Sequence, residues 1–282
     1  MVNYNSPKLI IIREKENIRN LLIVGRTGSG KSTLANVLTG TDDFKESGYT
    51  VSETKGFQKA TFDWQEKKYR VVDTIGVGDT QLSAKEVLYK IIDGIYSMPD
   101  GIYQVLFVVD GRFTAGEIKT FRLIKDSIDS ILSGNSGIDK SILDYITLVR
   151  TKFTNFRNNK ECETDKEKMI KENSSIAEVV NSCRDIIHVD NPPIDITQDD
   201  SDSEDTKINN GNARKKARKK LLGNLDAINQ EKYFKLKAWD ELYPEIAKYM
   251  ADMSKELSEE VENNPELQLL VQISSNALCL IL

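Results

Sequence analysis

Short apolar runs recur along the first two thirds of the chain, and stretches long enough for helices separate them. Within each run the apolar character is continuous rather than alternating, which is typical of strands buried on both faces of a mainly parallel sheet. The runs lie at 20–25, 70–74, 104–111, 146–151 and 185–190. The helix-length stretches lie at 31–39, 83–96, 115–132 and 165–183. This alternation predicts an α/β fold with helices on both faces of the sheet.

The segment at residues 57–63 (FQKATFD) has a different pattern, because its apolar and polar positions alternate. The short polar stretch 65–67 connects it to the apolar run that ends at 74. Alternation is typical of a strand with one solvated face, and a short polar connection suits a hairpin. We therefore expect one antiparallel strand at the edge of a sheet of six mostly parallel strands.

The character of the chain changes after the two prolines at 192–193. Residues 198–206 carry five acidic residues and no basic one, whereas residues 207–220 carry seven basic residues and no acidic one. The acidic stretch cannot bury apolar surface, so we expect a disordered linker or loop there. The predicted organisation is a lead-in over 1–16, an α/β domain over 17–195, the acidic linker over 196–212 and a basic helical extension over 213–282.

Composition and charge narrow the classes of function. The 39 basic and 44 acidic residues give a net charge of −5, which argues against a bulk nucleic-acid-binding protein. The three cysteines are widely spaced, and the single histidine, His188, argues against a zinc enzyme or a Ser-His-Asp hydrolase. We expect a protein of the reducing cytoplasm with no nucleic acid partner.

The strongest motif is GRTGSGKS at residues 25–32, which matches the phosphate-binding loop (P-loop) pattern GxxxxGK[ST]. It follows the apolar run 20–25 and opens the predicted helix 31–39, which is the context this loop requires. Glycines let backbone N–H groups converge on phosphate oxygens, while Lys31 would contact the β- and γ-phosphates and Ser32 would bind Mg²⁺. The residues expected to contact nucleotide here are Arg26, Thr27, Gly28, Ser29, Gly30, Lys31, Ser32 and Thr33.

A second motif, DTIG at residues 73–76, stands at the end of the run 70–74. A carboxylate at this strand end would hold Mg²⁺ directly or through water, and Gly76 would offer its backbone N–H to the γ-phosphate. A threonine between the two motifs should also bind Mg²⁺. Thr50, Thr54 and Thr61 are the candidates, and Thr61 is the weakest because it lies within the alternating strand. Thr54 just precedes that strand and is preferred over Thr50 as this catalytic and metal-binding residue.

Four segments in this order resemble the AIG-type GTPases, the immunity-associated GTPases and their plant and fungal relatives, which are related to septins and chloroplast outer-envelope import GTPases. They are GRTGSGKST (25–33), SETKGFQ (52–58), DTIGVGDT (73–80) and GRFTAGE (111–117). The resemblance covers about residues 17–195. It implies a Ras-like G domain that binds GTP or GDP with Mg²⁺ through Lys31, Ser32, Thr54, Asp73 and Gly76. It also implies homodimers or homo-oligomers formed through the G-domain face, and membrane association through the C-terminal extension.

The GRFT segment is the distinctive part of this resemblance. For Arg112, Phe113 and Thr114 the family implies a structural or interfacial role near the switch region. A buried Phe113 with Thr114 capping the following helix is an equally good interpretation.

Discrimination of guanine from adenine should weaken unless another group substitutes, because the [NT]KxD pattern of such proteins becomes TKFT at 151–154. Thr154 cannot make the paired charge-assisted bonds of an aspartate, each of which contributes about 1.5–3 kcal/mol. Lys152 can still lie against the base. Asn155 and Asn191 are candidates to replace the missing carboxylate, and Asn191 is favoured because it follows the last apolar run. His188, inside that run, is predicted to be structural.

Hydrolysis should be slow, because Val77 stands where Ras-like enzymes place a water-orienting glutamine. Arg26 would either act across a dimer on a second γ-phosphate or remain solvated, and Asp79 and Gln81 are weaker candidates for positioning water. The sequence favours a slow GTPase that acts as a dimerisation-linked switch or scaffold. An assembly module without hydrolysis and an ATP-using P-loop enzyme are the alternatives.

The basic segment 213–228 has three interpretations. It could lie on an anionic membrane or bind an acidic partner, serve as a nuclear-import patch, or form a solvated helix neutralised by the acidic run before it. A cytoplasmic protein, with peripheral attachment to an intracellular membrane as an alternative, is therefore expected.

Overall fold

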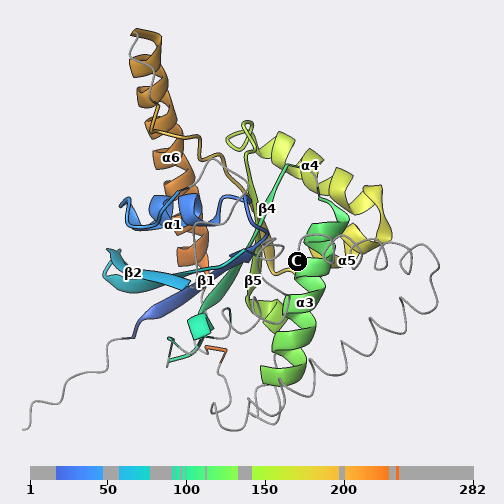
Figure 1. Cartoon of the computed structure of the whole chain (residues 1–282). Coiled ribbons are helices and arrows are strands. Elements are labelled where there is room, and N and C mark those ends of the chain that lie inside the picture. Colours follow the sequence, from blue (N-terminus) through green and yellow to red (C-terminus); the bar gives the residue numbers. More distant parts are fainter. Residues whose placement is uncertain are drawn as a thin grey trace, which may run out of the picture.

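A six-stranded sheet in the order β2-β3-β1-β4-β5-β6 forms the centre of the molecule (Figure 1). The computed structural model describes residues 17–46, 57–76, 91, 93–95, 97–98, 100–111, 113–132, 142–196, 201–228 and 233–234. The strands are β1 Arg19–Gly25, β2 Phe57–Trp64, β3 Lys67–Thr74, β4 Gln104–Asp110, β5 Ile146–Thr151 and β6 Asp185–His188. Only β2 is antiparallel to its neighbour within this sheet, so the predicted α/β fold is confirmed.

The edge strand forms a hairpin with β3, in which Phe57 pairs with Thr74 and Trp64 pairs with Lys67. The two connecting residues, Gln65 and Glu66, have φ of 47° and 61°. Two left-handed residues give the turn whose twist matches that of the flanking strands. The antiparallel edge strand predicted from the alternating pattern is therefore confirmed.

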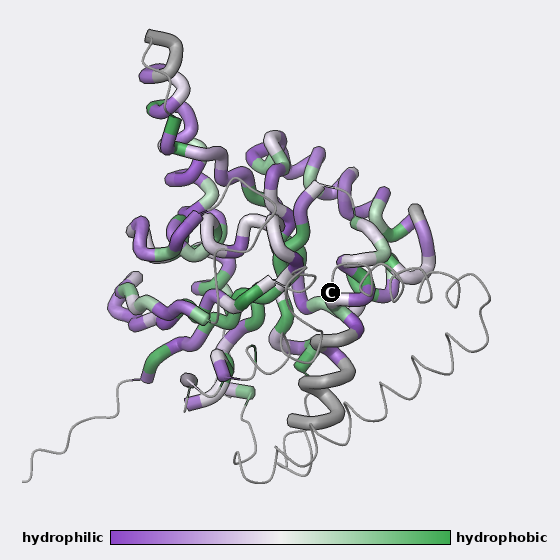
Figure 2. The backbone as a smooth tube through the Cα atoms, in the orientation of Figure 1, coloured by the Kyte–Doolittle hydropathy of each residue, from purple (hydrophilic) through white to green (hydrophobic). Residues whose placement is uncertain are grey.

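The parallel strands are buried on both faces, which accounts for their continuous apolar runs. In β1, Leu22 and Val24 belong to one hydrophobic cluster, whereas Leu21 and Ile23 belong to the other. The first cluster packs against helices α3 and α5, and the second against α1 and α6. The helices are α1 Lys31–Thr39, α3 Ala115–Leu132, α4 Asn159–Glu172, α5 Ser174–Ser182 and α6 Ser201–Ala227, with a short 3₁₀ helix, η1, at Ile142–Tyr145. Figure 2 shows hydrophobic residues concentrated along the strands between these layers.

The single helix expected at 165–183 is instead two helices. Asn158 caps α4 by accepting hydrogen bonds from the N–H groups of Lys160 and Glu161. Asn173 ends α4 and caps α5, because its side chain accepts from the N–H of Ile176 at 2.8 Å. Asparagine is a preferred N-cap, and this interruption is invisible to a pattern of apolar spacing.

The prediction of a disordered linker or loop is wrong for residues 201–212, which are helical in α6. Acidic side chains near the start of a helix interact favourably with its dipole, so a run of acids does not prevent helix formation there. The predicted boundary at residue 213 consequently falls within one continuous helix. The start of α6 extends past the body of the domain and is mostly hydrophilic (Figures 1 and 2).

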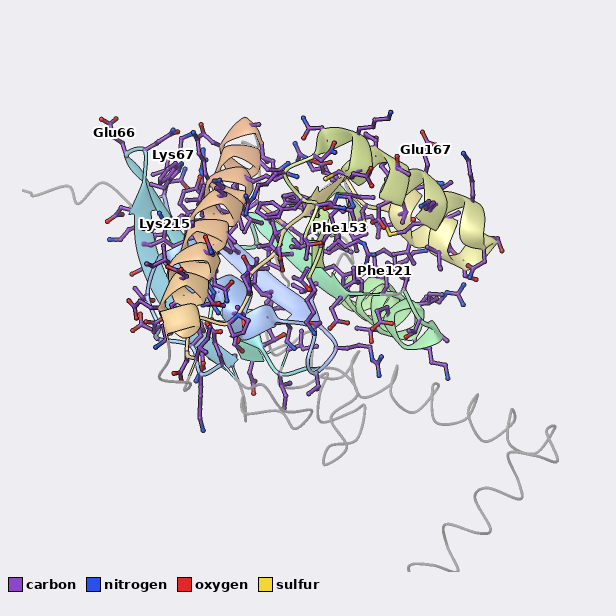
Figure 3. The ribbon with its side chains drawn as sticks, turned by 90° about the horizontal axis from the view of Figure 1, so that it is seen from above. Glu66, Lys67, Phe121, Phe153, Glu167 and Lys215 are labelled. Atoms are coloured by element: carbon purple, nitrogen blue, oxygen red, sulfur yellow. The ribbon has the colours of Figure 1, made fainter. Side chains whose placement is uncertain are left out.

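The second half of α6 is part of the domain rather than a separate extension. Ala217, Leu221, Leu222 and Leu225 are buried in the same cluster as α1 and the sheet. Figure 3 shows α6 along one side of the molecule and α4 and α5 on the opposite side. A membrane would have to compete with the sheet for this apolar stripe, so the structure does not support a membrane-lying role for it. No helix in the described part of the chain is both long and apolar enough to cross a bilayer.

Candidate nucleotide-binding site

The loop between β1 and α1 has the backbone that phosphate binding requires. Gly28 and Gly30 have φ of 81° and 91°, in the left-handed region that side chains other than glycine rarely adopt. Gly30 is the N-cap of α1 and supplies no side-chain cap. The first N–H groups of α1 therefore keep their hydrogen-bonding capacity for an anion.

Lys31 and Ser32 project from the first turn of α1 toward the end of β3. The Lys31 side chain is buried, with the residue only 7% exposed, and its Nζ donates to the Arg26 carbonyl oxygen at 3.0 Å. The Ser32 hydroxyl donates to Oδ2 of Asp73 at 2.7 Å. The hydroxyl and the carboxylate predicted to bind Mg²⁺ thus meet, although they are 41 residues apart.

Buried oxygen atoms without hydrogen-bond partners gather at the same place. Among the described residues they include Oγ1 of Thr27, Oγ of Ser29 and Oδ1 of Asp73. Such atoms are costly unless something satisfies them. The Ser32 hydroxyl and the Asp73 carboxylate are hard oxygen donors of the kind that Mg²⁺ prefers, so the residues present fit this ion.

The charged form of Asp73 is destabilising in the protein without nucleotide or metal. It is 0% exposed, and burial raises its pKa from 3.8 to about 6, although the charge of Lys31 and the Ser32 hydrogen bond oppose the rise. A divalent cation beside the carboxylate would stabilise its charged form.

Gly76 packs directly against the P-loop. A Cβ atom at this position would collide with the hydroxyl and backbone of Thr27. The DxxG segment therefore lies against the P-loop, and glycine is required there for its small size.

The TKFT segment lies beside the P-loop on the side expected to hold the base. The Thr151 hydroxyl donates to the Ser29 carbonyl oxygen at 2.8 Å, and Lys152, with φ of 54°, donates from Nζ to the Gly28 carbonyl oxygen at 3.4 Å. Lys152 also pairs with the Asp110 carboxylate. Thr154, which occupies the expected aspartate position, is exposed.

Asn191 is brought next to this segment by the hydrogen bond from the Phe153 N–H to the Val189 carbonyl oxygen. Both polar atoms of its side-chain amide are buried and have no partner within the described structure. Asn155, the other candidate, is exposed. Of the two candidates, only Asn191 has buried side-chain polar atoms without partners among the described residues.

Arg26 forms an intramolecular ion pair while its side chain stays partly exposed to solvent. Its Nη1 lies 3.2 Å from Oε1 of Glu117 at the start of α3, and its side chain is 41% exposed. Glu117 also accepts from the Thr114 N–H at 2.8 Å, while Thr114 Oγ1 accepts from the Gly116 N–H at 3.2 Å. These bonds form a capping box, so the interpretation of Thr114 as a helix cap is confirmed. Phe113 packs partly buried against the core.

His188 is structural, as predicted, and belongs to a cluster that sequence reasoning missed. Its Nε2 lies 2.9 Å from Oδ2 of Asp165, which also accepts from Arg150 Nε at 2.6 Å. The His188 ring packs on Phe153, with centroids 4.8 Å apart, and Phe153 is labelled in Figure 3. Through the contact between His188 and Phe153, this cluster supports the TKFT segment. Asp165 lies in a polar helix where nothing in the sequence distinguishes it from other carboxylates.

Several predicted site residues lie outside the described residues. They are Thr50, Thr54, Val77, Asp79, Gln81 and Arg112. Their roles in metal binding, water positioning and dimer contacts stay predictions.

Comparison with known families decides the affiliation. The sequence pattern of the AIG1 family matches residues 19–257, which is most of the chain. The chain belongs to the AIG1 family. This match extends past the boundary at 195 inferred from the sequence and includes α6, in agreement with the burial of α6 in the core of this AIG1 domain.

Solved structures similar to this AIG1 chain include Toc33 from Arabidopsis thaliana. A dimerisation-deficient Toc33 variant has a TM-score of 0.50 and 16% identity, covering 77% of this chain and 86% of that one. Toc33 in complex with Mg²⁺ and GMPPNP has a TM-score of 0.49 and 15% identity, covering 77% and 87%. At these identities the likeness concerns the fold alone. Comparison with curated protein sequences gives no match.

Proposed function

We propose that this AIG1 protein binds GTP and GDP together with Mg²⁺, hydrolyses GTP slowly, and acts as a switch or scaffold whose nucleotide state controls the pairing of two G domains. The convergence of Lys31, Ser32 and Asp73 with unpartnered buried oxygens at a P-loop is the observation that supports nucleotide binding most directly. Ser32 and Asp73 would hold Mg²⁺, with Thr54 as the predicted third ligand. The ion would neutralise charge on the β- and γ-phosphates.

Asn191 supports the guanine assignment in the absence of the usual aspartate. A side-chain amide offers one acceptor and two donors, so it can pair with the N1–H or amino group of guanine and with its O6. Both polar atoms of Asn191 are buried and unpartnered within the described structure. Adenine presents the opposite arrangement at these positions, but a neutral amide can turn over, so discrimination should be weaker than with a carboxylate.

Competition binding among GTP, GDP, XTP and ATP tests this assignment. We expect GDP and GTP to bind more tightly than ATP, and Asn191→Ala to lower GDP affinity about 10-fold, because two neutral hydrogen bonds contribute about 0.5–1.5 kcal/mol each. Asn155→Ala, a change at an exposed asparagine of the neighbouring loop, should leave affinity unchanged and serves as the matched control. ATP binding as tight as GTP binding would contradict the guanine assignment.

Single-turnover hydrolysis at increasing protein concentration tests the switch. Two observations motivate a mechanism in which a second protomer assists the reaction. Toc33 dimerises, and Val77 of this chain stands where Ras-like enzymes have a water-orienting glutamine. We expect a slow rate that rises with protein concentration. A rate independent of concentration, with no phosphate released in hours, would instead favour an assembly module without hydrolysis.

Three lysines of α6, Lys215, Lys216 and Lys219, are exposed and remain available to an acidic partner. Arg214, Arg218 and Lys220 are directed inward and bond to the domain itself. The basic run is accordingly only in part a surface feature.

A further inference from the structure

Arg214 of α6 is a buried arginine shared between two loops. It is 8% exposed, and its guanidinium uses three donors. Nε donates to the Pro192 carbonyl oxygen at 2.7 Å. Nη1 and Nη2 donate to the two carboxylate oxygens of Glu46 at 3.0 and 2.9 Å. A bidentate arginine–carboxylate pair fixes orientation as well as distance.

The two partners of Arg214 belong to two different loops of the domain. Pro192 directly follows Asn191, the residue proposed to bind the base. Glu46 lies in the loop after α1 and accepts hydrogen bonds from α1, the helix that begins at the P-loop. One side chain therefore bonds both to the loop after β6, which is predicted to contact the base, and to the loop after α1.

Glu46 is itself anchored to the helix that begins at the P-loop. Its oxygens accept from Asn36 Nδ2 at 2.9 Å and from the Thr33 hydroxyl at 3.1 Å. Burial would raise the pKa of Glu46, but the bonds from Arg214, Asn36 and Thr33 outweigh it and lower the pKa. The carboxylate is thus charged at neutral pH and fully used by this network.

We infer that Arg214 is a positioning residue of the nucleotide site, which couples the loop that contains Pro192 to helix α1 through Glu46. The inference rests on the proposed function, because it concerns how the same nucleotide is retained. Loss of the guanidinium releases both loops together, so bound nucleotide leaves faster. Lysine can replace it only in part, because a single ammonium lacks the planar fork that reaches Pro192 and both Glu46 oxygens at once.

The test is the dissociation rate of fluorescently labelled GDP, displaced by excess unlabelled GDP in Mg²⁺, from the full chain. We expect Arg214→Gln to raise this rate about 10-fold and Arg214→Lys to raise it about 3-fold. Glu46→Gln should raise the rate as well, and the double variant Arg214→Gln/Glu46→Gln should be no faster than Arg214→Gln, because residues in one network are not additive. Lys215→Gln, at the exposed neighbouring position, should match the wild type.

A second measurement separates positioning from general support of the fold. Inorganic tripolyphosphate contacts the P-loop but no base loop, so Arg214→Gln should weaken GDP binding several-fold more than tripolyphosphate binding. If Arg214→Gln does not fold, Arg214→Lys and Glu46→Gln carry the same comparison. Unchanged GDP release in these variants, with only a lower melting temperature, would overturn the inference alone. A wild-type protein that binds no GDP would overturn the proposed function and this inference with it.

Discussion

Replacing Lys31 with alanine should lower the affinity for Mg²⁺–GTP and Mg²⁺–GDP by at least about 100-fold. The Lys31 ammonium is buried at the start of α1 and bonded to the Arg26 carbonyl, so it is already oriented within the P-loop. Charge-assisted hydrogen bonds contribute about 1.5–3 kcal/mol each, and two of them, one to each phosphate, correspond to about 100- to 10,000-fold in affinity. Isothermal titration calorimetry with each nucleotide measures the loss directly.

The matched control for this change is Lys160→Ala. Lys160 is exposed in the first turn of α4, so its removal alters the net charge equally without touching the P-loop. We expect its nucleotide affinity to equal that of the wild type. A Lys31→Ala variant that still bound GTP within a few-fold of the wild type would show that the nucleotide is held elsewhere.

Replacing Asp73 with asparagine should stabilise the nucleotide-free protein at neutral pH while abolishing its response to Mg²⁺–nucleotide. The folded carboxyl has a pKa of about 6 against 3.8 for an ordinary aspartate, so the folded state holds its proton more tightly than the unfolded state. Stability from this group is therefore fully present below pH 3.8 and is lost as pH rises through about 6. The difference corresponds to about 3 kcal/mol, and we expect a gain of about 1–3 kcal/mol because asparagine retains part of the contact with Ser32.

Thermal unfolding at pH 5 and pH 7.5 in EDTA, then in Mg²⁺ with GDP, measures both effects. In EDTA, the advantage of Asp73→Asn over the wild type should grow with pH; in Mg²⁺ with GDP, the wild-type melting temperature should rise and that of the variant should not. Asp63→Asn, at an exposed position of β2, should follow the wild type in every condition. An Asp73→Asn protein less stable than the wild type at pH 7.5 in EDTA would contradict the assignment of a destabilising buried charge.

Elements whose signal lies within a few consecutive residues were predictable in detail. The helices 31–39 and 115–132 and the strand 146–151 have the predicted bounds, because a buried strand needs a continuous apolar run and a helix needs a regular apolar face. The P-loop was equally predictable, since its strand, its glycines and its lysine are contiguous. The break at Asn173 was not, because an asparagine caps a helix only where the chain has room to turn.

Helix α6 shows why composition misled. Its charges suggested a linker and a separate basic segment, although the apolar residues Ala217, Leu221 and Leu225 recur every four positions and mark a buried stripe. Because this apolar stripe is narrow and lies among many charged residues, the helix is easily mistaken for one exposed to solvent on all sides. The apolar stripe of α6 is buried because α6 packs beside α1 on the same face of the sheet, and the sequence of α6 does not encode that position.

The sequence by itself determined the α/β class, the position of the phosphate-binding loop and the absence of the usual base-binding aspartate. Each of these depends on residues that are close together in the sequence. Only the tertiary structure decided how the charged side chains are used: Arg26 pairs with Glu117 across 91 residues, and Arg214 pairs with Glu46 across 168. An arginine in a sequence looks the same whether it is solvated, bound to a membrane or buried on a carboxylate. The partner of Arg214 depends on the chain topology, which brings α1, the loop after β6 and α6 to one side of the sheet. No local sequence pattern encodes that proximity.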